Sequence, residues 1–344
     1  MAELPDEPRV KVLSIVGEGR SGSTVLAAIL GELPGAFDAG ELHWVWGRSL
    51  VEQRPCGCGR PPAQCPVWSP VVQKTFGVPP EDQAAGRGGE ATVEIVADER
   101  QVVARRNRLR LLRSADRVGP AWPALDRMRA VTESLYANLV DVTGARIVID
   151  ASKRPEDAAV LAGVGSVDLY VLHVVRDPRA VVFSWTRIKP SPDGRTVMQR
   201  MRPARIVRDW IESNAGAEVL RRHVPDDRWL FCTYEDFAAR PRETVGRIVA
   251  FMRAEGEAPF VTGDTVVLGA NHTLLGNPDR FRTGEVTVTP DERWRSQMPR
   301  RQQIGVRLAT WPLMRRYGYL RRGRCRASAA GHPGRPRDPH RLHE

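Results

Sequence analysis

The sequence lacks long apolar runs, is poor in cysteine and contains almost no lysine. No run approaches the about 18 apolar residues of a membrane-spanning helix. The first residues, MAELPDEPRVK, are acidic and contain proline, unlike a signal peptide. An odd total of five cysteines without a secretion signal argues against a disulfide framework. We therefore expect a cytoplasmic protein without a transmembrane segment.

Lysine supplies only four of the 52 basic residues, so arginine carries the net charge of +11. Seven arginines stand against Asp338 and Glu344 in residues 321–344, which we predict to form a basic, disordered tail. No helix-turn-helix, zinc-finger or RNA-recognition pattern is present, so no specific nucleic-acid partner is expected. The remaining positive charge is suited to a polyanionic small molecule.

Three of the few cysteines, Cys56, Cys58 and Cys65, are clustered. A structural zinc site needs four ligands, and His43 is the one candidate for the fourth that lies near them in the sequence. Free or transiently paired thiols are the alternative, which we favour.

Glycine, in contrast, is concentrated near the start of the chain, in VKVLSIVGEGRSGSTVLAAILG from Val10 to Gly31. Val12 to Val16 is typical of a strand buried on both faces, and Val25 to Leu30 of a short apolar helix. A glycine turn between a strand and a helix presents free N–H groups to an anion. The spacing from Gly17 to Thr24 resembles the nucleotide P-loop, but Ser23 replaces its lysine. Arg20 is the nearest cation.

Strand-like and helix-like segments alternate along the rest of the chain. We predict strands at 36–38, 146–150, 168–175 and 228–233, and helices following Pro155 and over 179–187, 204–223 and 243–254. This order predicts an α/β fold: a P-loop-like three-layer α/β/α domain over residues 1–320 with a central parallel sheet. Residues 47–119 would form an insert or lid, in which 47–90 lies outside the core. Amphipathic helices are expected over 91–114 and 124–142.

Five motifs in this order resemble those of sulfotransferases, especially the bacterial branch related to protein-tyrosine sulfotransferases. They are GRSGSTVL at 19–26, GE at 40–41, SK at 152–153, VRDPRAVVFSW at 175–185 and TYEDF at 233–237. The resemblance covers about residues 10–300. It implies 3′-phosphoadenylyl sulfate as the sulfuryl donor and a hydroxyl-bearing small molecule, glycan or lipid as the acceptor.

The resemblance also implies residues that bind the two anionic ends of the donor. The glycine turn would hold the phosphosulfate end, and a second group the 3′-phosphate and nucleoside. The first set is Arg20, Ser21, Gly22, Ser23 and Thr24, and the second is Arg176, Ser184, Tyr234, Arg280 and Arg282.

Sulfuryl transfer also needs a base for the acceptor hydroxyl and cations for the spreading charge. Glu41 matches the base of the tyrosine-sulfating relatives, with His43 as the second candidate. Arg20 and Lys153 are the expected cations, and no metal is required.

Two alternatives remain open. A P-loop kinase-like phosphotransferase would need a magnesium-binding aspartate, for which Asp150 is available at the end of a predicted strand. A non-catalytic nucleotide- or nucleic-acid-binding protein would use the basic tail. The sequence predicts neither the acceptor nor the oligomeric state.

Overall fold

The centre of the protein is a five-stranded sheet in which all strands run parallel. The computed structural model describes residues 9–79, 82, 89–113, 115, 121–187, 189–190, 197–198 and 200–320. The strand order is β2-β3-β1-β4-β7, so Lys11 of β1 lies beside Ile147 of β3 and Asp168 of β4. The strands are β1 (Val10–Gly17), β2 (Ala36–Gly40), β3 (Ile147–Lys153), β4 (Val167–Val175) and β7 (Trp229–Thr233).

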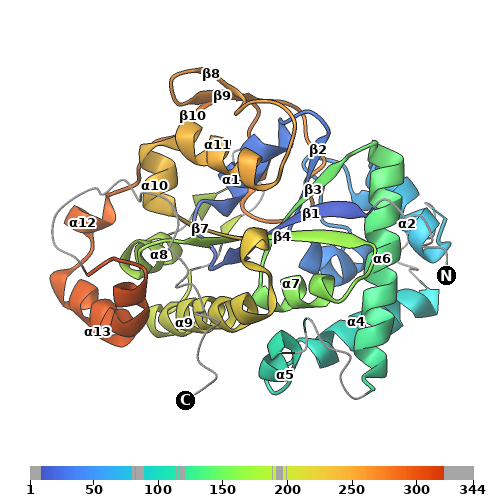
Figure 1. Cartoon of the computed structure of the whole chain (residues 1–344), viewed down its shortest axis with the longest axis horizontal. Helices are drawn as coiled ribbons and strands as arrows, with labels where there is room; N and C mark the ends of the chain where they lie inside the picture. Colours follow the sequence, from blue (N-terminus) through green and yellow to red (C-terminus); the bar gives the residue numbers. More distant parts are fainter. Residues whose placement is uncertain are drawn as a thin grey trace, which may run out of the picture.

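Helices cover both faces of this sheet, which makes the three layers visible in Figure 1. One face packs against α6 (Pro123–Thr143), α7 (Pro155–Ala162) and α9 (Pro203–Leu220). The other face packs against α1 (Ser23–Gly31) and α11 (Pro241–Phe251). The predicted P-loop-like α/β/α fold with a central parallel sheet is therefore confirmed.

The helices begin and end where local sequence signals place them. Pro155 occupies the first turn of α7, and Pro123 that of α6, where a missing N–H costs nothing. Asp177 caps α8 (Pro178–Trp185) by accepting a hydrogen bond from the Arg179 N–H at 2.9 Å. Gly144 ends α6 in the left-handed conformation, with a φ of 67°.

Two predictions about the elements are wrong, and one small sheet was not predicted. The helical pattern over 91–114 is split into α4 (Gly89–Val102) and α5 (Arg108–Arg113), because Asn107 closes a turn with its N–H on the Ala104 carbonyl. The segment after residue 47 enters the core, where Trp68 is fully buried on α2 (Trp68–Phe76). The strands β8 (Phe260–Thr262), β9 (Thr265–Leu268) and β10 (Gly284–Thr287) form an antiparallel sheet that the sequence pattern did not indicate.

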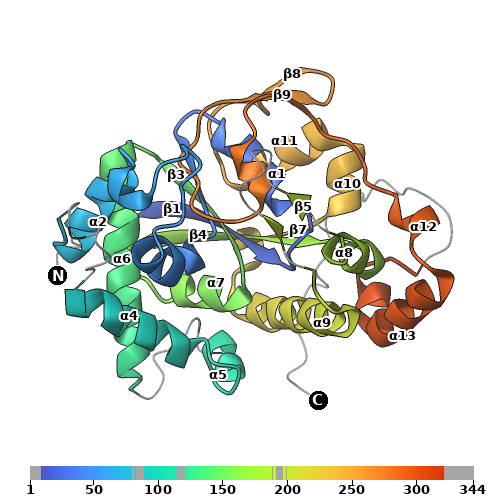
Figure 2. The ribbon, with the colours of Figure 1, turned by 180° about the vertical axis from the view of Figure 1, so that it is seen from behind.

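The remaining elements lie at the periphery. Figure 2 shows α13 (Arg300–Arg316) and α12 (Trp294–Gln297) at the end of the molecule opposite α2 and α4. Short elements also include the two-residue strands β5 (Lys189–Pro190) and β6 (Val197–Met198). The short helix α10 (Tyr234–Ala239) packs instead against the core through the buried Phe237. In the described part of the chain, no helix has the length and apolarity needed to cross a bilayer. The predicted tail, 321–344, lies outside the described residues.

Candidate functional site

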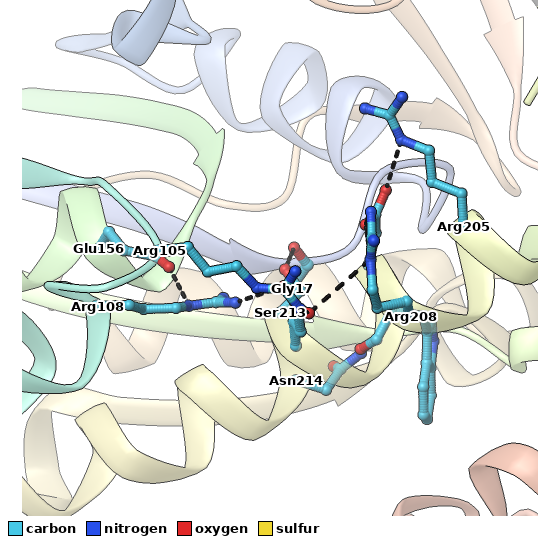
Figure 3. Close-up of polar contacts among 11 residues, drawn as sticks. Gly17, Arg105, Arg108, Glu156, Arg205, Arg208, Ser213 and Asn214 are labelled. Carbon is cyan, nitrogen blue, oxygen red and sulfur yellow. Dashed lines mark hydrogen bonds and ion pairs between the residues drawn. The ribbon is translucent and has the colours of Figure 1, made fainter. Parts of the chain in front are cut away.

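The glycine turn connects the central strand β1 to α1 at the carboxyl edge of the sheet, where ligands of open α/β folds bind. Gly17 approaches β4 so closely that a Cβ there would lie 2.2 Å from the Val174 carbonyl oxygen. Ser213 of α9 donates a hydrogen bond to the Gly17 carbonyl at 2.8 Å (Figure 3). The start of the turn is thus fixed by the neighbouring strand β4 and by the helix α9.

Two aromatic rings enclose the turn. A Cβ on Gly19 would lie 3.0 Å from the Trp185 ring, and one on Gly22 would lie 2.7 Å from the Tyr234 ring. Gly22 also has a φ of 79°, a conformation that glycine adopts without strain. Gly22 precedes α1 without a side-chain cap, so the first N–H groups of this helix remain available to an anion.

Two buried guanidinium groups meet at this turn. Arg176 donates a hydrogen bond to the Arg20 carbonyl at 3.0 Å, and the Arg20 guanidinium lies over the Trp185 ring at 4.8 Å. Among the described residues, Arg20 Nε and Nη2, Arg176 Nε and the Ser21 hydroxyl are buried without hydrogen-bond partners. Burial lowers the pKa of Arg20, which the neighbouring Arg176 charge lowers further. An anionic ligand is suited to accept hydrogen bonds from these unpaired groups, because most of them belong to positively charged guanidinium groups.

Arg176 also belongs to a second contact group. Its guanidinium lies over the Tyr234 ring at 4.0 Å and contacts the Asp291 carbonyl at 3.1 Å. The Tyr234 hydroxyl in turn accepts a hydrogen bond from the Asp291 N–H at 3.2 Å. The predicted residues Arg20, Arg176 and Tyr234 therefore lie together. Ser184 is half-buried on α8, one residue before Trp185.

Glu41 and Lys153 meet in an ion pair. Glu41 follows β2, and Lys153 is the last residue of β3. These two strands are adjacent and parallel, with Gly40 beside Asp150, so both side chains emerge at the same edge of the sheet. Glu41 also accepts a hydrogen bond from Trp44 Nε1 at 3.2 Å, and Lys153 donates to the Ala151 carbonyl at 3.2 Å. Both side chains keep limited solvent access, at 15% and 13% exposure. A partly accessible carboxylate beside an ammonium is suited to moving a proton near a developing negative charge.

His43, the second candidate for the base, lies in a different environment. Residues 42–44 form a 3-10 turn, and the His43 ring is buried against Trp44. Burial holds the pKa of His43 well below its usual range, and the Arg154 and Lys153 charges lower it further. His43 also stays away from the cysteines, so the expectation that it could complete their ligand set is wrong.

Asp150, which a kinase would need for magnesium, has its carboxylate occupied. Both oxygens accept hydrogen bonds, from the Tyr136 hydroxyl at 2.7 Å and from the Ser152 N–H at 2.9 Å and hydroxyl. Burial raises the pKa of Asp150 to about 6. This enclosed carboxylate holds Tyr136 and Ser152 in place through its hydrogen bonds.

The two late arginines differ. Arg280 is buried and donates to the carbonyls of Gly276 at 3.1 Å and Pro55 at 3.4 Å. This position is on the Glu41 side, since a Cβ on Gly276 would lie 3.1 Å from Glu41 Oε1. Arg282 has an exposed side chain.

Glu18 is a residue of the turn that sequence reasoning missed. Desolvation by burial raises its pKa to about 7, and Asp209 raises it as well. The Gly19 N–H and the charges of Lys153 and Arg108 act in the opposite direction. A carboxyl inside an anion-binding motif was the available signal, because such a group is poorly matched to a second negative charge.

Glu18→Gln is expected to stabilise the protein at alkaline pH. Because the folded-state pKa is raised above 4.5, the proton on Glu18 favours folding below about pH 4.5, and this contribution is lost as the pH rises through about 7. The variant should therefore gain up to about 3 kcal/mol of unfolding free energy at pH 8 and little at pH 4.5. Urea titrations of both proteins at the two pH values measure this difference. An equal effect at both would contradict the assignment, and the exposed Glu255→Gln serves as control.

The three clustered cysteines are brought together with His272, which the sequence analysis did not connect to them. All four cysteines that fall within the described residues are free. The fourth member of the cluster is a histidine from a distant segment.

Comparison with known proteins identifies the fold. No family model matches the chain, and no curated protein matches its sequence. Among solved structures, the sulfotransferase domain of the Synechococcus PCC 7002 olefin synthase is 22% identical. That match covers 93% of this chain and 98% of that one, with a TM-score of 0.56. The sulfotransferase domain from the curacin biosynthetic pathway is 15% identical over 88% of this chain and 97% of its own, with a TM-score of 0.48. The chain has the fold of a sulfotransferase domain.

Proposed function

We propose that this protein transfers a sulfuryl group from 3′-phosphoadenylyl sulfate to a hydroxyl of an acceptor. The observation that carries the proposal is the pair of buried guanidinium groups, Arg20 and Arg176, with unsatisfied donors beside the glycine turn. The sulfotransferase fold supports the same conclusion at a coarser level.

The two anionic ends of this donor need two positive sites, and the residues fit that need. The phosphosulfate end would bind at the N-terminus of α1, to the N–H groups and hydroxyls of Ser23 and Thr24 and to Arg20. The 3′-phosphate would bind Arg176, with Ser184 and Tyr234 on the elements that flank it. Arg280 and Arg282 belong to the segment that would close over the donor.

The chemistry would be an in-line displacement at sulfur. The acceptor oxygen forms a new bond to sulfur while the bond from sulfur to the leaving phosphate oxygen breaks. Glu41 accepts the proton of the acceptor hydroxyl, and the leaving phosphate takes the electron pair of the broken bond. Lys153 and Arg20 stabilise the charge on that phosphate and on the sulfuryl oxygens.

The ion pair with Lys153 bears on how Glu41 would act. The Lys153 ammonium contacts both Glu41 and the Ala151 carbonyl. A donor phosphate beside Lys153 would share that ammonium with Glu41. Donor binding would thereby leave the Glu41 carboxylate free to contact the acceptor hydroxyl.

Two measurements test the donor. Calorimetry should detect binding of adenosine 3′,5′-bisphosphate in magnesium-free buffer and no binding of ATP with Mg²⁺. Arg176→Ala should weaken the bisphosphate by at least about tenfold, because a charge-assisted hydrogen bond contributes about 1.5–3 kcal/mol. Arg146→Ala is the matched control, since Arg146 lies at the opposite end of β3 and is 57% exposed.

The alternatives predict other results. Tight binding of ATP with Mg²⁺ would favour a kinase-like enzyme, which the enclosed Asp150 disfavours. DNA binding that survives deletion of residues 321–344 would favour a nucleic-acid-binding protein. The acceptor is sought by incubating labelled donor with phenols, sugars and lipids.

A further inference from the structure

The cysteine-rich insert and a segment far along the chain converge on one cluster of metal-binding side chains. Cys56, Cys58, Cys65 and His272 each offer one donor atom, and these four atoms all lie within 4.8 Å of one another. The Cys65 sulfur lies 3.7 Å from that of Cys56, 3.9 Å from that of Cys58 and 3.2 Å from His272 Nδ1. The Cys56 sulfur lies 4.0 Å from the same nitrogen.

These separations match the coordination shell of zinc. Zinc–sulfur bonds of about 2.3 Å at tetrahedral angles place two sulfurs about 3.8 Å apart. With a zinc–nitrogen bond of about 2.0–2.1 Å, a sulfur and a nitrogen lie about 3.5 Å apart. Three soft thiolates and one imidazole are a closed structural set for zinc and a poor one for magnesium or calcium. We propose that Cys56, Cys58, Cys65 and His272 bind a structural Zn²⁺ ion.

The surroundings of the cluster fit such an ion. Cys56 and Cys65 are fully buried, next to the buried Trp68. Backbone N–H groups of Val67 and Trp68 point at the Cys65 sulfur, and that of Cys58 at the Cys56 sulfur. Hydrogen bonds of this kind stabilise thiolates around a metal.

The tight turn through the first two cysteines also fits. The Gly59 N–H donates to the Cys56 carbonyl at 2.8 Å with a Gly59 φ of 82°, and Gly57 N–H to Thr273 O at 2.9 Å. A Cβ on Gly57 would lie 1.8 Å from Asn271 Oδ1, so only glycine permits this approach. The turn therefore holds the sulfurs of Cys56 and Cys58 next to the segment that carries His272.

The ion would fasten this late segment to the sheet. Leu274 forms bridges to both Gly40 and Cys56, and its carbonyl accepts the Glu41 N–H at 2.9 Å. His272 lies two residues before Leu274, and Trp68 Nε1 donates to its carbonyl. Zinc would hold the insert and residues 271–276 in one arrangement next to Glu41. This conclusion rests on the cluster alone and does not depend on the proposed reaction.

The test is the metal content of the full chain, purified without a polyhistidine tag from zinc-supplemented cells. Inductively coupled plasma mass spectrometry should find about one zinc per chain. Cys65→Ser and His272→Ala should carry at least about tenfold less after dialysis, because three ligands do not close a structural site. Cys232→Ser, which changes a buried thiol on β7 outside the cluster, should keep the metal.

A second set of measurements tests the site even if Cys65→Ser or His272→Ala folds poorly. His272→Cys preserves four ligands and should retain zinc where His272→Ala loses it. Co²⁺ added to the metal-free protein should give the intense visible absorption of a tetrahedral site and a thiolate charge-transfer band. A chelator should lower the melting temperature of the wild type and of Cys232→Ser.

Three results would overturn the proposal. The first is wild-type protein without bound zinc that also gives no tetrahedral Co²⁺ spectrum. The second is stoichiometric iron in place of zinc. The third is a disulfide between two of the three cysteines, detected by mass spectrometry after alkylation of the freshly purified protein.

Discussion

Glu41→Gln is expected to reduce sulfuryl transfer by about 10²–10⁴-fold, the usual contribution of a general base. Glutamine keeps the shape of the side chain and can still accept the hydrogen bond from Trp44 Nε1. It cannot take the proton of the acceptor hydroxyl. The loss should therefore appear in kcat, while the affinity for adenosine 3′,5′-bisphosphate stays close to that of the wild type.

The ion pair with Lys153 supplies a competing explanation, which the same variant separates. If Glu41 only held Lys153 in place, Glu41→Gln would disturb donor binding and thermal stability along with turnover. Glu255→Gln is the control, because Glu255 pairs with Arg146 in an exposed contact at 73% exposure. Activity within about threefold of the wild type would refute the role of Glu41, since a base contributes about 10²-fold or more. His43→Gln would then become the decisive variant.

Arg20→Met is expected to reduce turnover by about 10²–10³-fold, the usual effect of removing one donor that stabilises transition-state charge. The same substitution should leave the ligand-free protein as stable as the wild type, or more stable by about 1–2 kcal/mol, because an incompletely paired buried charge costs several kcal/mol. Methionine preserves an apolar stem beside the Trp185 ring. Arg20 has a φ of 68°, and methionine bears the same backbone strain there as arginine because both residues carry a Cβ.

This prediction is specific because turnover should fall while the free energy of unfolding stays the same or rises. A structural arginine would give a less stable protein, with activity lost in proportion to unfolding. Thermal denaturation without ligand and single-turnover rates with saturating donor are the two readouts. Arg20→Lys should recover part of the rate, because it restores the charge without the forked geometry. Arg146→Ala should change neither quantity.

Local patterns in the sequence predicted the framework of the site well. The apolar run of β1, the glycine turn and the apolar helix α1 lie consecutively, so their arrangement follows from neighbouring residues. The strand-helix alternation then predicted parallel strands whose carboxyl ends share one edge. This topology is why Glu41 and Lys153, which are far apart in the sequence, were expected in one site and form an ion pair. Their catalytic roles stay predictions.

Other features depend on tertiary contacts that no local pattern records. Most of the chain separates His272 from the three cysteines. His43 was the candidate for the fourth ligand because it lies near them in the sequence. Trp68 is surrounded by proline and glycine, which hid the burial of α2. Glu18 lies inside the glycine turn, but the burial that raises its pKa exists only in the folded protein.

The strand order has a consequence for the synthesis of the chain. β1 is made well before both of its partners, as Lys11 pairs with residues 147 and 168. At about 5–20 residues per second, a ribosome needs roughly 7–30 seconds to make the intervening residues. During that interval the apolar β1 cannot form its sheet, so the nascent chain exposes it to chaperones and to aggregation. The glycine turn is thus translated well before the strands that flank β1 in the sheet.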